Sequence, residues 1–160
     1  MLQKKIRSLL VVALTTIVHW SPFPPAAFGE TGRQMRPNEL VQRGKDVRNE
    51  INSVYQTLKT EKKLSGRGTD ISDHVRKYIP PGSSFDDAEE ILRSAGFSVS
   101  GRPPGDTTSN WPDRYDVGAS LELYGSFAIK IQAIVSLTPK RPGDYGEVSG
   151  VSAGIFVSSL

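Results

Sequence analysis

The residue types best suited to binding lie together in one short segment. Residues 110–116 read NWPDRYD and combine two large aromatic rings, an arginine and two aspartates. Trp, Tyr and Arg contribute much of the binding energy in protein interfaces. The segment therefore predicts a binding site made by Trp111, Asp113, Arg114 and Tyr115. In the alternative interpretation, both rings fold inward to cover an open edge of the core, and Arg114 pairs with an aspartate.

Carboxylates in and beside this segment are the residues that could support catalysis. Two carboxyl groups placed on either side of a glycosidic bond can hydrolyse it without a histidine. Asp113, Asp116 and Glu122 have the required chemistry, but spacing along the chain is the only argument for them. A carboxylate-based hydrolase therefore ranks behind the binding functions, and we predict no catalytic residue.

Metal sites and nucleophilic sites lack the residues that they require. His74 is the only histidine after residue 29, and the chain has no cysteine. A Ser-His-Asp triad would have to use this one histidine, and a zinc site needs a cluster of cysteines and histidines. We expect His74 to be a structural or surface residue, and we predict no metal site and no cofactor.

The acidic run DDAEE at residues 86–90 has a structural explanation. Ser84 precedes it as a helix N-cap, with Asp87 at the third helical position, close to a capping box. Carboxylates in the first turn stabilise a helix by ~0.3–1 kcal/mol each. Gly96 suits the left-handed position that ends a helix, and Phe97 can fold back onto the last turn. The buried stripe of this helix is expected to contain Phe85, Ala88, Leu92 and Ala95.

The first 29 residues have the layout of a secretory signal peptide. Three basic residues precede an uncharged, mostly apolar run at residues 8–20, and Ala27 and Gly29 supply the small side chains of a cleavage site. The run is shorter than the ~20 residues needed to span a bilayer. We predict cleavage between Gly29 and Glu30, a secreted or periplasmic protein, and no membrane span after cleavage.

The formal charge of +3 comes from this leader. Three of the 20 Lys and Arg residues lie in the first 29 residues, whereas none of the 17 Asp and Glu residues does, so the remaining chain carries 17 of each. A balanced charge gives no general attraction to phosphate backbones, and we expect no nucleic-acid partner. The absence of cysteine agrees with a bacterial periplasmic protein that is stabilised by packing.

Two helices are expected before the acidic one. After a flexible stretch at residues 30–37, apolar side chains recur at helical spacing through residues 38–64. Gly44 lies on this stripe and weakens the helix by ~1 kcal/mol relative to Ala, unless another backbone approaches closely. The stripe could also form a coiled coil, so self-association through residues 38–63 is an open alternative. A shorter helix is predicted at residues 70–79.

Strict alternation predicts an antiparallel sheet in the C-terminal part. Nearly every odd residue from Val117 to Leu137 is apolar, including Phe127 and Ile129, which we expect on the buried face. We place a type II′ hairpin turn at Gly125-Ser126, and alternation resumes over residues 148–158. Residues 69–160 should therefore form an α+β domain. Its N-terminal helices pack on one face of a C-terminal antiparallel sheet of three to four strands.

The stretch from Gly82 to Val99 resembles two families of exported proteins. Gly82-Ser83-Ser84, the helix through Leu92 and then Gly96 resemble the SmpA/OmlA (BamE-like) envelope proteins and the repeat unit of the β-lactamase-inhibitor protein. This resemblance implies a helix pair on one face of a three-stranded antiparallel sheet. SmpA/OmlA proteins are usually lipoproteins, whereas this chain has no cysteine to carry a lipid. The stretch is also similar to the core of PASTA modules, which bind cell-wall fragments, at Gly82, Ser84, Ala88, Leu92, Ala95, Gly96, Phe97 and Val99.

These observations favour an exported, non-enzymatic domain that binds another protein in the bacterial periplasm or cell envelope. The alternative is a module that binds a small molecule or a cell-wall glycan, through residues 110–116 and the crevice between helices and sheet. A carboxylate-based hydrolase is the third class of function.

Overall fold

The computed structural model describes residues 35–103 and 115–159 of the 160-residue chain. The predicted signal peptide and the predicted site residues Trp111, Asp113 and Arg114 lie outside this part. Among the described residues, no helix has both the length and the apolar composition needed to cross a bilayer. The elements are α1 (Pro37–Thr60), β1 (Thr69–Asp70), α2 (Ser72–Arg76), α3 (Phe85–Ser94), β2 (Ser98–Val99), β3 (Val117–Gly125), β4 (Ile129–Arg141) and β5 (Asp144–Ser159).

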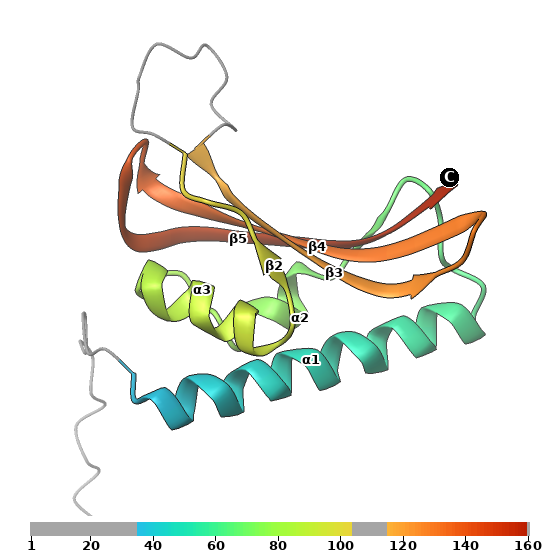
Figure 1. Cartoon of the computed structure of the whole chain (residues 1–160), viewed down its shortest axis with the longest axis horizontal. Coiled ribbons are helices and arrows are strands. Elements are labelled where there is room, and N and C mark those ends of the chain that lie inside the picture. The colour runs from blue at the N-terminus through green and yellow to red at the C-terminus, as the bar shows by residue number, and fades with distance from the viewer. Residues whose placement is uncertain (1–34, 104–114, 160) are drawn as a thin grey trace, which may run out of the picture. The chain divides into compact units, whose positions relative to one another are not determined.

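Five antiparallel strands form one sheet in the order β1-β5-β4-β3-β2. Figure 1 shows α1, α2 and α3 on the same side of this sheet, so the predicted α+β architecture is confirmed. The prediction of three to four strands is wrong, because β1 and β2 each have only two residues and are too short to show alternation. Both are edge strands, where short length limits pairing with other chains.

The core lies between the sheet and the three helices. Alternate residues of β3, β4 and β5 point into it, and burial of each large apolar side chain stabilises the fold by ~1.5–3 kcal/mol. The fully buried side chains of the long strands are Val117, Ala133, Val135, Leu137, Val148 and Ile155. The opposite face of the sheet carries mostly small or polar side chains, and we call it the open face.

Helix α1 contributes its predicted stripe to this core. Leu40, Val47 and Ile51 are 8%, 1% and 0% exposed, and Gly44 lies at the closest approach of α1 to α3. Because the core of the domain itself covers the stripe, self-association through residues 38–63 would need another face of the helix.

Helix α3 is the helix predicted after Ser84, and its ends form as expected. The Ser84 hydroxyl accepts a hydrogen bond from the Asp87 backbone N–H at 3.5 Å. Gly96 adopts a φ of +89°, and the Phe97 N–H donates to the Leu92 carbonyl at 3.0 Å. This last bond is typical of a Schellman motif, which satisfies carbonyls at a helix end.

The helix predicted at residues 70–79 is shorter than expected. Thr69 and Asp70 pair with β5 as strand β1, so α2 contains only Ser72–Arg76. The apolar face is nevertheless placed as predicted, since Ile71, Val75 and Ile79 are at most 2% exposed. Pairing with β5 outcompetes the helical pattern at Asp70 because it satisfies backbone groups on the edge of the sheet.

The turn between β3 and β4 differs from the prediction. A type II′ turn would require a positive φ at Gly125, and Gly125 is not among the glycines with positive φ. The connection is instead residues 126–128, closed by the Ser126 hydroxyl, which accepts a hydrogen bond from the Ile129 N–H at 3.1 Å. The prediction of a type II′ turn is therefore wrong.

A register shift precedes this turn and changes which side chains are covered. The pairing of β3 with β4 is interrupted between Glu122 and Tyr124, where the strand has one extra residue, a β-bulge. Phe127 and Ile129, which were expected in the buried set, are 97% and 43% exposed. Phe127 lies in the connection between the two strands and Ile129 is the first residue of β4, so the same pattern no longer means burial at the tip.

Candidate functional site

Only one of the four predicted binding residues lies in the described part of the chain. Tyr115 is 7% exposed, and its carbonyl oxygen lies 3.1 Å from the Tyr145 hydroxyl. Tyr115 is therefore buried, although it is not part of the hydrophobic core cluster. Trp111, Asp113 and Arg114 lie outside the described residues.

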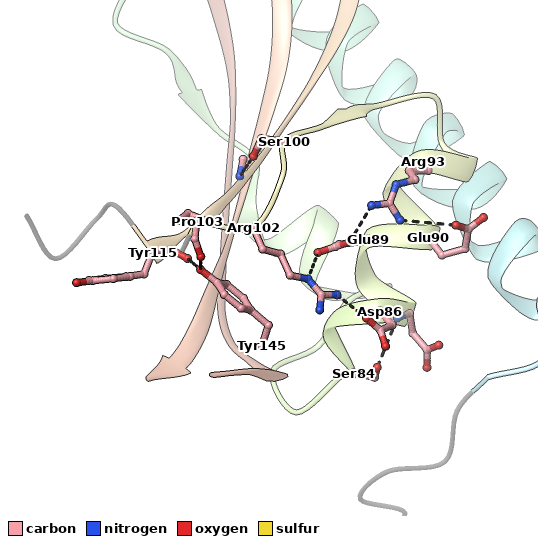
Figure 2. Close-up of polar contacts among 12 residues, drawn as sticks. Ser84, Asp86, Glu89, Glu90, Arg93, Ser100, Arg102, Pro103, Tyr115 and Tyr145 are labelled. Carbon is pink, nitrogen blue, oxygen red and sulfur yellow. Dashed lines mark hydrogen bonds and ion pairs between the residues drawn. The ribbon is translucent and has the colours of Figure 1, made fainter. Parts of the chain in front are cut away.

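The residues that flank positions 104–114 are held by a polar cluster at the N-terminal end of α3 (Figure 2). The Tyr145 hydroxyl lies 3.1 Å from the carbonyl oxygens of both Pro103 and Tyr115. One side chain therefore joins the two ends of this segment. Burial raises the pKa of Tyr145, with the positive charge of Arg102 acting in the opposite direction.

Arg102 links the same cluster to α3. Its guanidinium carbon lies 5.7 Å from the ring centroid of Phe85 and 5.6 Å from that of Tyr145, and its Nε is 2.7 Å from Glu89 Oε1. It also pairs with Asp86. Hydrogen bonding to Glu89, the largest cause, raises the pKa of Arg102. The cluster thus neutralises a buried carboxylate and anchors the chain.

Three of the four carboxylates in the acidic run at residues 86–90 are accounted for by these contacts. Glu89 has a side chain that is 7% exposed, and it pairs with both Arg102 and Arg93. Glu90 lies 3.9 Å from Arg93. Figure 2 shows these carboxylates turned toward the two arginines. A buried carboxylate held by two guanidinium groups is an ion-pair network, which agrees with the structural role predicted for this run.

The described carboxylates proposed for hydrolysis do not come together. Asp116 precedes β3 and accepts hydrogen bonds from Ser136 and Thr138 at 2.9 and 3.1 Å. Glu122 lies six residues further along the extended strand, a separation of ~20 Å, and pairs with Lys130 at 3.4 Å. Glycosidase carboxyl pairs lie roughly 5–9.5 Å apart. Asp116 and Glu122 therefore cannot form such a pair.

His74 is engaged in an ion pair, and the one serine of a G-x-S-x-G match lies in a strand. His74 Nδ1 lies 2.7 Å from Glu50 Oε1, and Lys77 Nζ lies 3.0 Å from the same oxygen. The hydrogen bond with His74, and then the one with Lys77, lower the pKa of Glu50. Residues 150–154 read GVSAG and match a G-x-S-x-G pattern, but Ser152 lies inside β5 opposite Ser136. A nucleophile elbow needs a sharp strand-to-helix turn instead.

The surface best equipped for recognition is the tip of the β3–β4 hairpin. Tyr124, Phe127 and Ile129, which we call the hairpin ledge, are 47%, 97% and 43% exposed. Tyr124 pairs with the core residue Ile131, and Ile129 precedes it by two positions, so both lie on the sheet face that is covered elsewhere by helices. The ledge is therefore an uncovered continuation of the core.

Sequence reasoning missed the ledge because it treated the alternation as unbroken. One signal was present. Leu123 and Tyr124 are two successive apolar residues in a strand that otherwise alternates, and such a pair marks a possible change of phase.

Within residues 35–103 and 115–159, no group of three or more His, Cys, Asp or Glu side chains is arranged to hold a metal ion. Comparisons of the chain with protein-family models, with curated proteins and with solved structures find no match.

Proposed function

We propose that this protein is an exported, non-enzymatic domain that binds another protein through the hairpin ledge. The observation that carries the proposal is Phe127, a phenyl group 97% exposed at the end of a paired hairpin. Large exposed apolar groups that gather in one place on a folded domain typically mark an interaction surface. The signal-peptide layout of residues 1–29 supports a place in the periplasm or cell envelope.

We expect the partner to bind the side chains of the hairpin ledge and not to add a strand to the edge of the sheet. Beyond Ser120, the outer edge of β3 has no strand neighbour among the described residues, so pairing with an incoming strand deserves consideration. The bulge before Tyr124 disturbs that edge, and bulges are a known way to prevent edge pairing. An apolar pocket that accepts the Phe127 ring therefore fits the ledge better.

One ion pair lies close to the ledge, on the opposite face of the hairpin. Glu122 folds toward the tip, with Oε1 2.5 Å from a Cβ built at Gly125, and it pairs with Lys130 at 3.4 Å. In a protein interface a few residues carry most of the binding energy. Tyr124 and Phe127 are the residues we expect to dominate.

A site-specific cross-link tests the proposal. A photoreactive phenylalanine analogue at position 127, in protein expressed in its native host, should form one discrete adduct, and the same analogue at Phe156 should not. The adducted protein, once identified and purified, should bind Phe127→Ala at least about tenfold more weakly than the wild type. If Phe156→Ala binds the identified protein as tightly as the wild type does, the weaker binding of Phe127→Ala reflects the loss of a specific contact.

Other results in this experiment overturn the proposal. Equal affinity of Phe127→Ala and the wild type for the identified protein would place the interface elsewhere. Trp111→Ala in the same assay tests residues 110–116 as the competing surface. Adducts with lipid, or with a second copy of the chain, would replace a partner protein with a membrane surface or with self-association.

A further inference from the structure

A groove on the open face of the sheet is separate from the hairpin ledge. It has a volume of about 390 Å³ and lies between strands β4 and β5 and the chain that leads into α2. This volume is within the roughly 300–1,000 Å³ typical of small-molecule sites. The lining residues that matter here are Arg67, Asp70, Ile134, Ser152 and Phe156.

Phe156 packs against two glycines in this groove, and we call its ring the platform. A Cβ built at Gly68 would lie 2.4 Å from the Phe156 ring, and one built at Gly154 would lie 2.7 Å from it. Any side chain at either glycine would displace the ring, and Gly68 also has a φ of +83°. The ring is nevertheless 37% exposed, and Ile134 beside it is 40% exposed. Two apolar side chains are therefore presented on an otherwise small and polar sheet face.

Hydrogen-bonding groups of both kinds surround the platform. Asp70 Oδ1 accepts hydrogen bonds from the backbone N–H and hydroxyl of Ser72 at 2.8 and 2.5 Å, and the hydroxyl bond is the main cause of the lowered pKa of Asp70. Its carboxylate therefore remains an acceptor near neutral pH. Within the described residues, the exposed Arg67 guanidinium and the exposed Ser152 hydroxyl form no hydrogen bond or ion pair and can donate.

We propose that this groove binds a neutral saccharide. A pyranose ring has one apolar C–H face that can lie on an aromatic platform, and a rim of hydroxyl groups that both donate and accept hydrogen bonds. A purely apolar ligand would desolvate Asp70 and Arg67 without pairing them. A simple anion would be attracted to Arg67 but repelled by Asp70. The proposal does not depend on protein binding at the ledge.

The test uses three disaccharides as probes: cellobiose, maltose and N,N′-diacetylchitobiose. Each is titrated into ¹⁵N-labelled protein, and amide chemical shifts are followed by NMR. At least one probe should shift the amides of Gly68, Asp70, Gly154 and Phe156 in a saturable manner. Phe156→Ala should weaken that binding by about tenfold or more, whereas the matched variant Phe127→Ala, which removes a phenyl group from the ledge, should bind as the wild type does.

Three outcomes would overturn the saccharide site. They are the absence of saturable shifts with all three probes, shifts that map outside the groove, and unchanged binding by Phe156→Ala. Cyclohexanol serves as an apolar probe, and equal binding of cyclohexanol would show that hydroxyl recognition plays no part. Because Phe127→Ala impairs only the proposed protein contact, failure of one proposal is distinguishable from failure of the other.

Discussion

Gly44 of α1 and Ser94 of α3 lie so close that a Cβ built at Gly44 would be 2.4 Å from the Ser94 Cβ. The Ile91 carbonyl oxygen would lie only 2.8 Å from the same position. Figure 1 shows α1 running beneath α3 in the helical layer. The glycine that weakens α1 as an isolated helix is thus the residue that lets it pack against the rest of the domain.

The first prediction concerns this crossing. Gly44→Ala gains ~1 kcal/mol of helix propensity, but it forces a methyl group against the backbone of α3, so we expect a net loss of about 1–3 kcal/mol in the free energy of unfolding. Urea denaturation measures it. The control is Gly101→Ala, where no atom of the described residues lies within 4 Å of the new Cβ. Equal stability of the two variants would contradict the close approach.

The second prediction concerns Arg102. Arg102→Ala removes one of the two partners of Glu89, a side chain only 7% exposed, and it also removes the guanidinium from the Phe85 and Tyr145 rings. Removing one hydrogen-bond partner of a buried carboxylate lowers the free energy of unfolding by about 1–3 kcal/mol. Denaturant titration should show this loss. Arg36→Ala, which removes an exposed ion pair with Glu39 at 3.7 Å, should stay within ~0.5 kcal/mol of the wild type.

The third prediction separates the hydroxyl of Tyr145 from its ring. Tyr145→Phe keeps the edge-to-face contact with Phe85, whose ring centroid is 5.2 Å away, but removes the donor to the carbonyls of Pro103 and Tyr115. We expect a loss of about 0.5–1.5 kcal/mol. Faster hydrogen exchange of amides next to these two residues should accompany it. A stable variant with unchanged exchange would show that the hydroxyl does not join the two ends of the segment.

The fourth prediction is a pH dependence at Glu50. Its two partners lower its folded pKa below the usual 4.5, so its ion pairs contribute stability that is present above pH 4.5 and lost as the pH falls through the lower folded value. The free energy of unfolding of the wild type should therefore fall more steeply below pH 4.5 than that of Glu50→Gln.

Denaturant titrations between pH 7 and pH 3 measure this difference. Glu39→Gln changes an exposed carboxylate on the same helix and serves as the control, which should follow the wild-type curve. If Glu50→Gln shows the same acid dependence as the wild type, the carboxylate does not gain stability from His74 and Lys77.

Local patterns in the sequence predicted the parts of the fold that local forces decide. The capping serine Ser84, the apolar stripe of α3 and the left-handed Gly96 all act within a few residues of each other, so the helix and both its ends followed from the chain alone. The alternation of β3 and β4 likewise predicted the face that fills the core. The two short edge strands carry no such pattern, because pairing with a neighbour creates them.

The candidate sites depend on contacts between residues that lie far apart in the sequence. For Tyr115 the chain left an exposed and an inward-folded position open, and the structure shows a buried residue whose carbonyl meets the Tyr145 hydroxyl. Phe127 looked like a core residue, and Phe156 had no distinguishing signal. Its platform exists only because Gly68 and Gly154, 86 positions apart in the numbering, both lie against its ring.

By itself, then, the sequence determined the fold class, the polarity of each long strand face and the residues that begin and end α3. It also determined that no site can be built from cysteines or from a cluster of histidines. The tertiary structure alone decided which part of the apolar strand face is covered. Alternation specifies which side of a strand is apolar, but burial requires something to cover that side, and the side chains at the tip of the β3–β4 hairpin are left exposed. Phe127 is exposed for that physical reason, and the interaction surface proposed for this protein follows from it.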